Sequence, residues 1–240
     1  MPQEEMLVMA MTRMRSGVCT AGLLRQRHER SGLRWVRPVK EHGALLLGDV
    51  ATAEGQVLSC GDVVRLNLLR PCPEPPHCED WITDWVYQRP QIVGHLDDER
   101  WSRSLRLACD RAPEDILGQQ VRSLCLVRPE AVWAIFSGET PGRYEARLGF
   151  QLAGVSHPSA STPQGIPVSD IKWRALGRDW LAGRPATLRL SGDEIRERLN
   201  VDDIYLAVGL TRRFEGRIWP LVIGVHTVPD YTMAINYDHL

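Results

Sequence analysis

The feature that most constrains this chain is a strict alternation of apolar and polar or small residues around position 148. The apolar positions are Tyr144, Ala146, Leu148, Phe150 and Leu152. A period of two places these side chains on one face of a β-strand and leaves the other face polar. Because one face must be covered, the chain has to build sheets that pack on one another or close on themselves.

Further strand patterns recur along the chain, whereas helical patterns are few. Expected strands are Leu7–Met11, Val64–Leu68, Leu124–Val127, Val132–Phe136, Ile204–Val208 and Leu221–Val228. A helix is expected over Glu99–Cys109, and Ser191 with Glu194 forms a capping box that opens a second helix ending at Leu199. Many short strands and few helices predict a mainly β protein made of barrels or sandwiches.

The chain of 240 residues is long enough for one large β domain or two small ones. The segment 71–76 contains four prolines, which lack amide donors, and is expected to be a loop. A boundary between two halves is expected in the polar stretch 97–120, after which strand patterns restart. We place the halves at residues 1–110 and 111–240.

The charge balance restricts how the protein could bind nucleic acid. The formal net charge is −1, which excludes a basic field over the whole molecule, so any nucleic-acid site must be local. The basic residues are nearly all arginine, since Lys40 and Lys172 are the only lysines among 29. Arginine grips phosphate with two parallel hydrogen bonds and stacks on rings, although a biased genome composition explains the same preference.

The N-terminal sequence and the cysteines indicate a cytoplasmic protein. The first residues are acidic, no signal-peptide cleavage pattern follows, and no apolar stretch is long enough to span a bilayer. Six cysteines spread over the chain do not resemble a secreted disulfide framework. We therefore expect a reduced, cytoplasmic protein with no membrane partner.

Each half places arginine beside an aromatic residue or at the end of an apolar strand. In the first half this is Trp35-Val36-Arg37, and in the second it is Gly209 to Phe214, which includes two adjacent arginines. Such pairs can hold a phosphate while a ring stacks on a base. The residues expected to contact nucleic acid are Trp35, Arg37, Lys172, Trp173, Thr211, Arg212 and Arg213.

Two other kinds of chemistry stay open as alternatives. Asp170 and Lys172 match the second half of a metal-dependent nuclease signature, with Glu145 as the nearest strand carboxylate that could complete it. Cys60, Cys72, His77 and Cys78 could supply zinc ligands, but adjacent His77 and Cys78 cannot easily point into one tetrahedron. The sequence has no phosphate-binding glycine loop and no dinucleotide fingerprint, so we predict no cofactor.

Several short motifs, taken together, resemble the bacterial dual OB-containing domain proteins over nearly the whole chain. The motifs are residues 16–22, 35–39, 71–81, 123–126, 169–173 and 209–212. The family-typical residues among them are Cys19, Gly22, Trp35, Arg37, Pro38, Glu79, Asp170, Gly209, Thr211 and Arg212. Cys72, Cys78 and Lys172 depart from the pattern, which weakens the zinc hypothesis and leaves the role of the segment around Lys172 open.

The resemblance implies two tandem OB-like β-barrels and a nucleic-acid-binding role in prokaryotic defence systems. The leading hypothesis is a non-enzymatic module that binds single-stranded DNA or RNA, or a nucleic-acid end, beside a separate catalytic or effector protein. The alternatives are the nuclease built on Asp170 and Lys172, and an assembly or sensor subunit that binds protein or a nucleotide-like signal. OB folds also bind proteins and small ligands, so the resemblance alone does not choose among these hypotheses.

Overall fold

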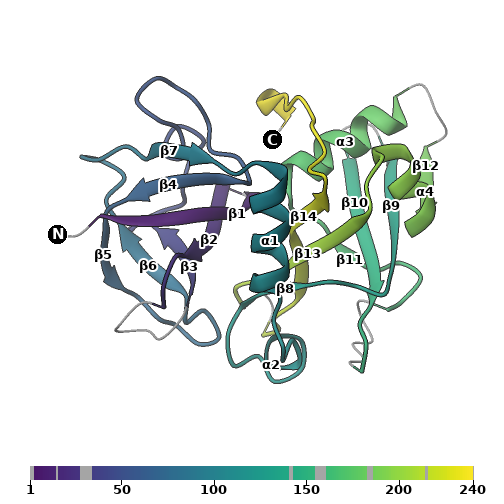
Figure 1. Ribbon diagram of the computed structural model, residues 1–240, viewed down its shortest axis with the longest axis horizontal. Helices are drawn as coiled ribbons and strands as arrows, with labels where there is room; N and C mark the ends of the chain where they lie inside the picture. The colour runs from purple at the N-terminus through teal and green to yellow at the C-terminus, as the bar shows by residue number, and fades with distance from the viewer. Residues whose placement is uncertain are drawn as a thin grey trace.

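Two β-rich lobes lie side by side, and helix α1 (Asp98–Ala108) runs along their junction (Figure 1). The computed structural model describes residues 3–14, 16–27, 34–140, 143–154, 161–182, 186–213 and 216–239. We call strands β1 to β7 the first lobe, and strands β8 to β14 with helices α2 to α4 the second lobe. The N-terminus lies at the far end of the first lobe.

The first lobe is one seven-stranded sheet that curls into a half-barrel. Its strands, in spatial order, are β5 (Leu68–Pro71), β6 (Asp80–Thr83), β3 (Trp35–Val39), β2 (Gly17–Leu24), β1 (Glu4–Met14), β4 (Asp62–Leu66) and β7 (Gln91–His95). Neighbours are antiparallel except β3 and β6, which run parallel. A register shift between Val8 and Ala10 bends β1, as β-bulges do, so that one end pairs with β4 and most of its length with β2.

The second lobe packs two smaller sheets around its own core. One sheet has the order β11 (Ile166–Pro167), β10 (Arg143–Gln151), β9 (Ala131–Thr140) and β12 (Thr187–Ser191). The other has the order β14 (Pro220–Val228), β13 (Asp203–Leu210) and β8 (Leu124–Val127). The alternating apolar residues Ala146, Leu148 and Phe150 of β10 are buried in the core, as their spacing predicts.

The three longer helices begin at side-chain caps that the sequence supplies. Asp97 caps α1, and Ser191 with Glu194 forms the predicted capping box of α4 (Gly192–Leu199). Asp170 caps α3 (Ile171–Leu181), which covers the second lobe's core with Trp173 and Leu176. The short elements α2 (Glu114–Leu117) and η1 (Tyr237–His239) complete the chain.

A third buried cluster joins the two lobes. It contains residues from β1, β2 and β3 on one side, from β8, β13 and β14 on the other, and Trp101 and Leu105 of α1. Backbone pairing crosses the junction as well, because the Arg13 amide donates to the Ser169 carbonyl at 2.9 Å. The lobes therefore share a packed interface, and residues from both are held in fixed relative positions along it.

The predicted fold class is confirmed, since the protein is mainly β and built of several sheets. The clearest error is at residues 171–181, where the sequence analysis expected no helix and the structure has α3. The predicted division at residues 110 and 111 falls between α1 and α2 and stays a prediction. In the part of the chain that is described, no helix is long and apolar enough to cross a membrane.

Candidate functional site

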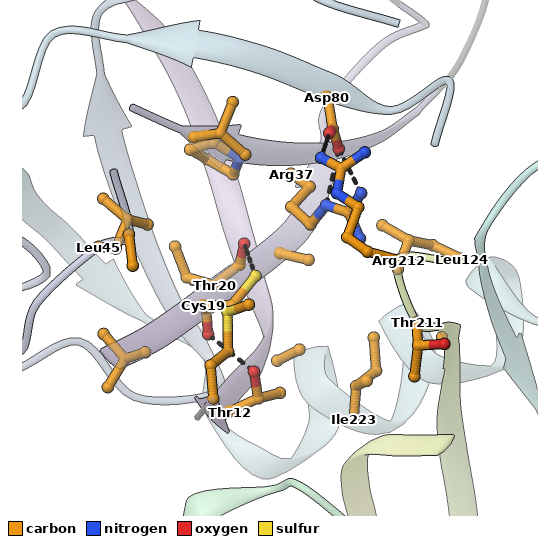
Figure 2. Close-up of a pocket in the computed structure, with 18 of the residues that line it drawn as sticks. Thr12, Cys19, Thr20, Arg37, Leu45, Asp80, Leu124, Thr211, Arg212 and Ile223 are labelled. Atoms are coloured by element: carbon orange, nitrogen blue, oxygen red, sulfur yellow. Dashed lines mark hydrogen bonds and ion pairs between the residues drawn. The ribbon is translucent and has the colours of Figure 1, made fainter. Parts of the chain in front are cut away.

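A cavity of about 660 Å³ opens between the two lobes. Its walls come from the ends of β1, β2 and β3 and the segment 40–45 in the first lobe, and from β13, β14 and residues 211–213 in the second. Figure 2 shows Thr12, Cys19 and Thr20 on one side and Thr211 and Ile223 on the other. This volume lies in the range of sites that hold a small organic ligand.

Arg37 and Arg212, which come from different lobes, converge on one carboxylate at the cavity wall (Figure 2). Arg37 donates from Nε to Asp80 Oδ1 at 2.7 Å, and its Nη2 lies 2.6 Å from the same oxygen. Arg212 donates from Nη2 to Asp80 Oδ2. Each oxygen of Asp80 therefore holds one guanidinium, and the three side chains form a fixed group of two positive charges and one negative charge.

The parallel pairing of β3 with β6 places Asp80 in this position. Arg37 lies opposite Asp80 in the register, and the Arg37 amide donates to the Glu79 carbonyl at 2.8 Å. Asp80 is only 1% exposed, so its charge would be strongly destabilising without partners. The side chain of Arg37 is also largely buried, whereas that of Arg212 is 47% exposed. Arg37 thus serves mainly to neutralise Asp80, and Arg212 keeps a face open to ligand.

The solvent side of this group carries a second carboxylate and a third arginine. Glu74 Oε2 lies 3.2 Å from Arg212 Nη1, and the Glu74 side chain is 79% exposed. Exposed ion pairs of this kind contribute about 0–1 kcal/mol. Arg213 also lines the cavity, and its Nη1 donates to the Gly216 carbonyl at 2.8 Å. The mouth therefore offers two arginines whose partners on the solvent side are weak or uncharged.

The electrostatic field of the arginines acts on two nearby titratable side chains. Burial and the positive charges of Arg37 and Arg212 together lower the pKa of His77 to about 3, while a hydrogen bond with the Thr211 backbone opposes the shift. Burial raises the pKa of the Cys19 thiol, and the Arg37 charge opposes that effect. At neutral pH the imidazole is uncharged and the thiol is protonated, so neither carries the charge of an acid or nucleophile in the resting site.

Most of the remaining cavity wall is apolar. Val18 and Leu45 in the first lobe, together with Leu124, Leu221 and Ile223 at the junction, line the space below the arginines. Such a wall favours the flat or aliphatic part of a ligand, while the arginines favour an anionic part. The arrangement fits a ligand that has both parts.

Glu79 links the two lobes through hydrogen bonds. Its buried carboxylate accepts hydrogen bonds from the Ser123 amide at 2.9 Å, the Ser123 hydroxyl at 2.9 Å and the Leu124 amide at 3.0 Å. Burial raises the pKa of Glu79, and the Ser123 hydrogen bonds oppose that shift. Glu79 therefore fixes β6, and with it Asp80, against the start of β8.

Both tryptophans that the sequence analysis assigned to base stacking are buried. Trp173 is fully buried among Phe136, Trp180 and Tyr231, and Trp35 packs in the cluster that joins the lobes. A buried ring cannot stack on a base without leaving the core. The burial of Trp35 and Trp173 therefore argues against the stacking prediction, which rested on the basic residues near them in the sequence.

The predicted nuclease residues are already occupied by structural contacts. Asp170 is buried and accepts from the amides of Trp173 at 3.1 Å and Val225 at 2.6 Å. Lys172 forms an ion pair with Asp230 at 2.7 Å, and its Nζ lies 4.0 Å from the centre of the Tyr231 ring. Glu145 is exposed on β10. Asp170 thus acts as a helix cap, and Lys172 does not line the cavity with the arginines.

The alternative zinc ligands do not come together. No group of three or more His, Cys, Asp or Glu side chains in the described ranges could hold a metal ion. Cys78 Sγ contacts the Val121 carbonyl at 3.6 Å, and Cys72 lines the cavity wall. Burial raises the pKa of the Cys60 thiol, and the charge of Asp170 raises it as well. The hypothesis that Cys60, Cys72, His77 and Cys78 form one site is therefore wrong for this structure.

Two residues were missed from the sequence: Asp80, which lines the cavity, and Trp219, which is not part of the lining but lies beside Thr211. Asp80 opens the apolar strand Asp80–Thr83, and an acid in such a strand signals a buried charge that needs a cationic partner. Trp219 is 46% exposed, and its backbone pairs with Thr211, next to Arg212. No periodicity marks Trp219, since it precedes β14 in an irregular segment.

Comparison with known families matches the dual OB-containing domain over residues 4–166. The chain belongs to this family. The match includes Cys19, Arg37 and Asp80 on the cavity wall and ends before Arg212 and Arg213. No curated protein and no solved structure matches the chain.

Proposed function

We propose that this dual OB-containing domain protein binds the end of a single-stranded nucleic acid in the cavity between its lobes. The observation that carries the proposal is that Arg37, Arg212 and Arg213, which come from distant parts of the sequence, line one cavity. OB folds commonly bind nucleic acids, which supports the ligand class.

The charge distribution supports a local site. The whole chain has a net charge of −1, yet five basic residues line the cavity against three acids: Arg13, Arg37, Lys40, Arg212 and Arg213 against Glu41, Glu74 and Asp80. Arginine forks bind phosphate oxygens with two parallel hydrogen bonds. A phosphate at the mouth would be met by Arg212 and Arg213, whereas Arg37 would hold Asp80 behind them.

The size and lining of the cavity favour the end of a nucleic acid over a continuous strand as the ligand. About 660 Å³ with apolar walls suits a terminal nucleotide whose base enters the cavity while its phosphate stays among the arginines. The exposed ring of Trp219, beside Thr211, replaces the buried tryptophans as the surface on which a neighbouring base would stack.

We also propose that a separate catalytic or effector protein acts on the bound nucleic acid. Asp170 and Lys172 are engaged in a helix cap and an ion pair, and Cys19 and His77 are uncharged in the resting cavity. The side chains at hand are therefore suited to binding.

Salt-dependent binding tests the proposal. Fluorescence anisotropy with short single-stranded DNA and RNA, between about 50 and 200 mM salt, should show affinity that falls as salt rises. Arg212→Ala and Arg213→Ala should each reduce the slope by about 0.7, the value for one phosphate contact on a single strand. Arg189→Ala, an exposed arginine on β12, should bind as the wild type does. Absence of salt-sensitive binding to either nucleic acid would contradict the proposal.

The cavity volume also favours a second candidate, the recognition of a free nucleotide as a signal. Isothermal titration with mononucleotides separates the two. Binding of a mononucleotide as tight as that of an oligonucleotide with the same terminal residue favours the signal, and much weaker binding favours the nucleic-acid end.

A further inference from the structure

Arg212 holds two carboxylates that differ in burial. Asp80 is buried and shared with Arg37, so it belongs to the permanent structure of the site. Glu74 meets only the other side of the guanidinium, through one contact of 3.2 Å, and its side chain is largely exposed. An entering anion can therefore displace Glu74 from Arg212 and leave Asp80 in place.

The backbone keeps Glu74 close to the cavity even though its side chain is exposed. Its amide donates to the His77 carbonyl at 3.2 Å, and its carbonyl accepts from the His77 amide at 2.7 Å. The same residue lines the cavity wall. The Glu74 carboxylate is thus an oxyanion that the protein itself presents to the ligand-facing side of Arg212.

We propose that Glu74 is an internal competitor for the anionic group of the ligand, and that the group which displaces it is a terminal phosphate monoester. The proposal rests on the proposed function and specifies its ligand. With Glu74 in contact, the two acids and the two arginines Arg37 and Arg212 sum to zero charge. When Glu74 leaves, the group regains one positive charge beside Arg213.

A terminal phosphate is better suited to this exchange than an internal phosphodiester. A phosphate monoester carries a charge of about −1.5 to −2 at neutral pH and has three acceptor oxygens, whereas a diester in the strand carries a single charge. Only the monoester therefore brings more charge to the arginines than the carboxylate it replaces. The apolar walls below the arginines leave room for the nucleoside attached to it.

Equilibrium binding of matched oligonucleotides tests this inference. The ligands are one single-stranded sequence with a 5′-phosphate, with a 3′-phosphate or with hydroxyls at both ends, and the corresponding mononucleotide. The proteins are the wild type, Glu74→Gln and the control Glu5→Gln, which removes an exposed acid that pairs with Arg65 and does not line the cavity.

We expect the wild type to prefer one of the phosphorylated ends over the hydroxyl end. Glu74→Gln should tighten binding of every oligonucleotide by about twofold to fivefold, the range that an exposed ion pair covers. The gain should be largest for the hydroxyl end, because that ligand competes least well with the carboxylate. Glu5→Gln should leave all affinities unchanged.

The outcomes separate this inference from the proposed function. If the wild type binds oligonucleotides but Glu74→Gln changes nothing and no end is preferred, the inference is overturned and the proposed function stands. If binding appears only in Glu74→Gln, the inference is supported, since the competitor then masks the site completely. If no protein binds any oligonucleotide or the mononucleotide, both are overturned. Equal urea midpoints for the three proteins confirm that the substitutions leave the fold intact.

Discussion

Asp80 and Asp170 are both buried aspartates near the junction of the lobes, but they hold different kinds of partner. Asp170 accepts two backbone amides and lies in a closed environment, where it begins α3 and ties it to β14. Asp80 accepts two arginine side chains and lies on the wall of a cavity. A buried carboxylate that accepts hydrogen bonds from backbone amides stabilises the fold. A buried carboxylate that pairs with arginines beside a cavity holds those charges where a ligand can reach them.

The largest expected effect is a loss of stability on replacement of Asp170. Asp170→Ala should lower the free energy of unfolding by about 3 kcal/mol, since it removes a helix cap and leaves the buried Val225 amide without its acceptor. Urea denaturation measures the loss. Asp179→Ala, an exposed aspartate on the same helix, should change stability little. An equally stable Asp170→Ala protein would contradict the structural role of this residue.

The two arginines that contact Asp80 should contribute unequally to stability. Arg37→Ala should cost about 2–3 kcal/mol of unfolding free energy, because it removes the buried partner of a buried charge. Arg212→Ala should cost about 1 kcal/mol or less, because its side chain is half exposed. Urea denaturation of both variants measures the difference. If both substitutions had the same effect on stability, the distinct roles assigned to the two arginines would be wrong.

Acid should weaken the fold through the buried histidines. Burial and the charge of Lys172 together lower the pKa of His226 to about 3. An unfolded histidine titrates near pH 6.5, so the stability contributed by neutral His226 is present above that pH and is lost as the pH falls towards 3. The loss between pH 7 and pH 5 should be about 2 kcal/mol for His226, and His77 adds a loss of the same sign.

Asp170 should oppose this loss, because burial raises its pKa to about 6 while the amides of Val225 and Trp173 limit the shift. Its contribution is present below pH 3.8 and is lost as the pH rises through 6. Urea denaturation at pH 7 and pH 5 should therefore show a smaller acid loss in His226→Gln and a larger one in Asp170→Asn. Equal acid losses in all three proteins would show that neither group titrates as its burial requires.

The sequence predicted part of the strands and predicted the helices unevenly. The expected strand Val64–Leu68 spans the end of β4 and the start of β5, and β6, β7 and β12 were not predicted. The segment Leu124–Val127 coincides with β8, and the alternating residues around Leu148 lie in β10. These strands could be predicted because a buried strand face requires apolar residues at the buried positions. The helix α3 was missed although Trp173, Leu176 and Trp180 follow helical spacing. Asp170 was interpreted as a metal ligand, whereas it caps this helix.

The candidate site was predicted in part. Arg37, Thr211, Arg212 and Arg213 were identified from their positions at strand ends, and they all line one cavity. The shared partner Asp80 could not be deduced in the same way, because the parallel pairing of β3 with β6 is a property of the tertiary fold. The same limit explains the stacking prediction, since the exposure of Trp35 depends on packing between the lobes and that of Trp173 depends on how α3 packs on the second lobe's core.

Occlusion of the cavity tests directly whether the ligand binds between the two lobes. Ala44 lies half-buried on the cavity wall in the segment 40–45, so a tryptophan at this position would fill the space without disturbing either core. The account predicts that Ala44→Trp abolishes binding of a terminally phosphorylated single strand at every salt concentration, while Ala186→Trp, at an exposed position in the second lobe, binds as the wild type does. Wild-type affinity in a folded Ala44→Trp protein would show that the ligand does not enter this cavity.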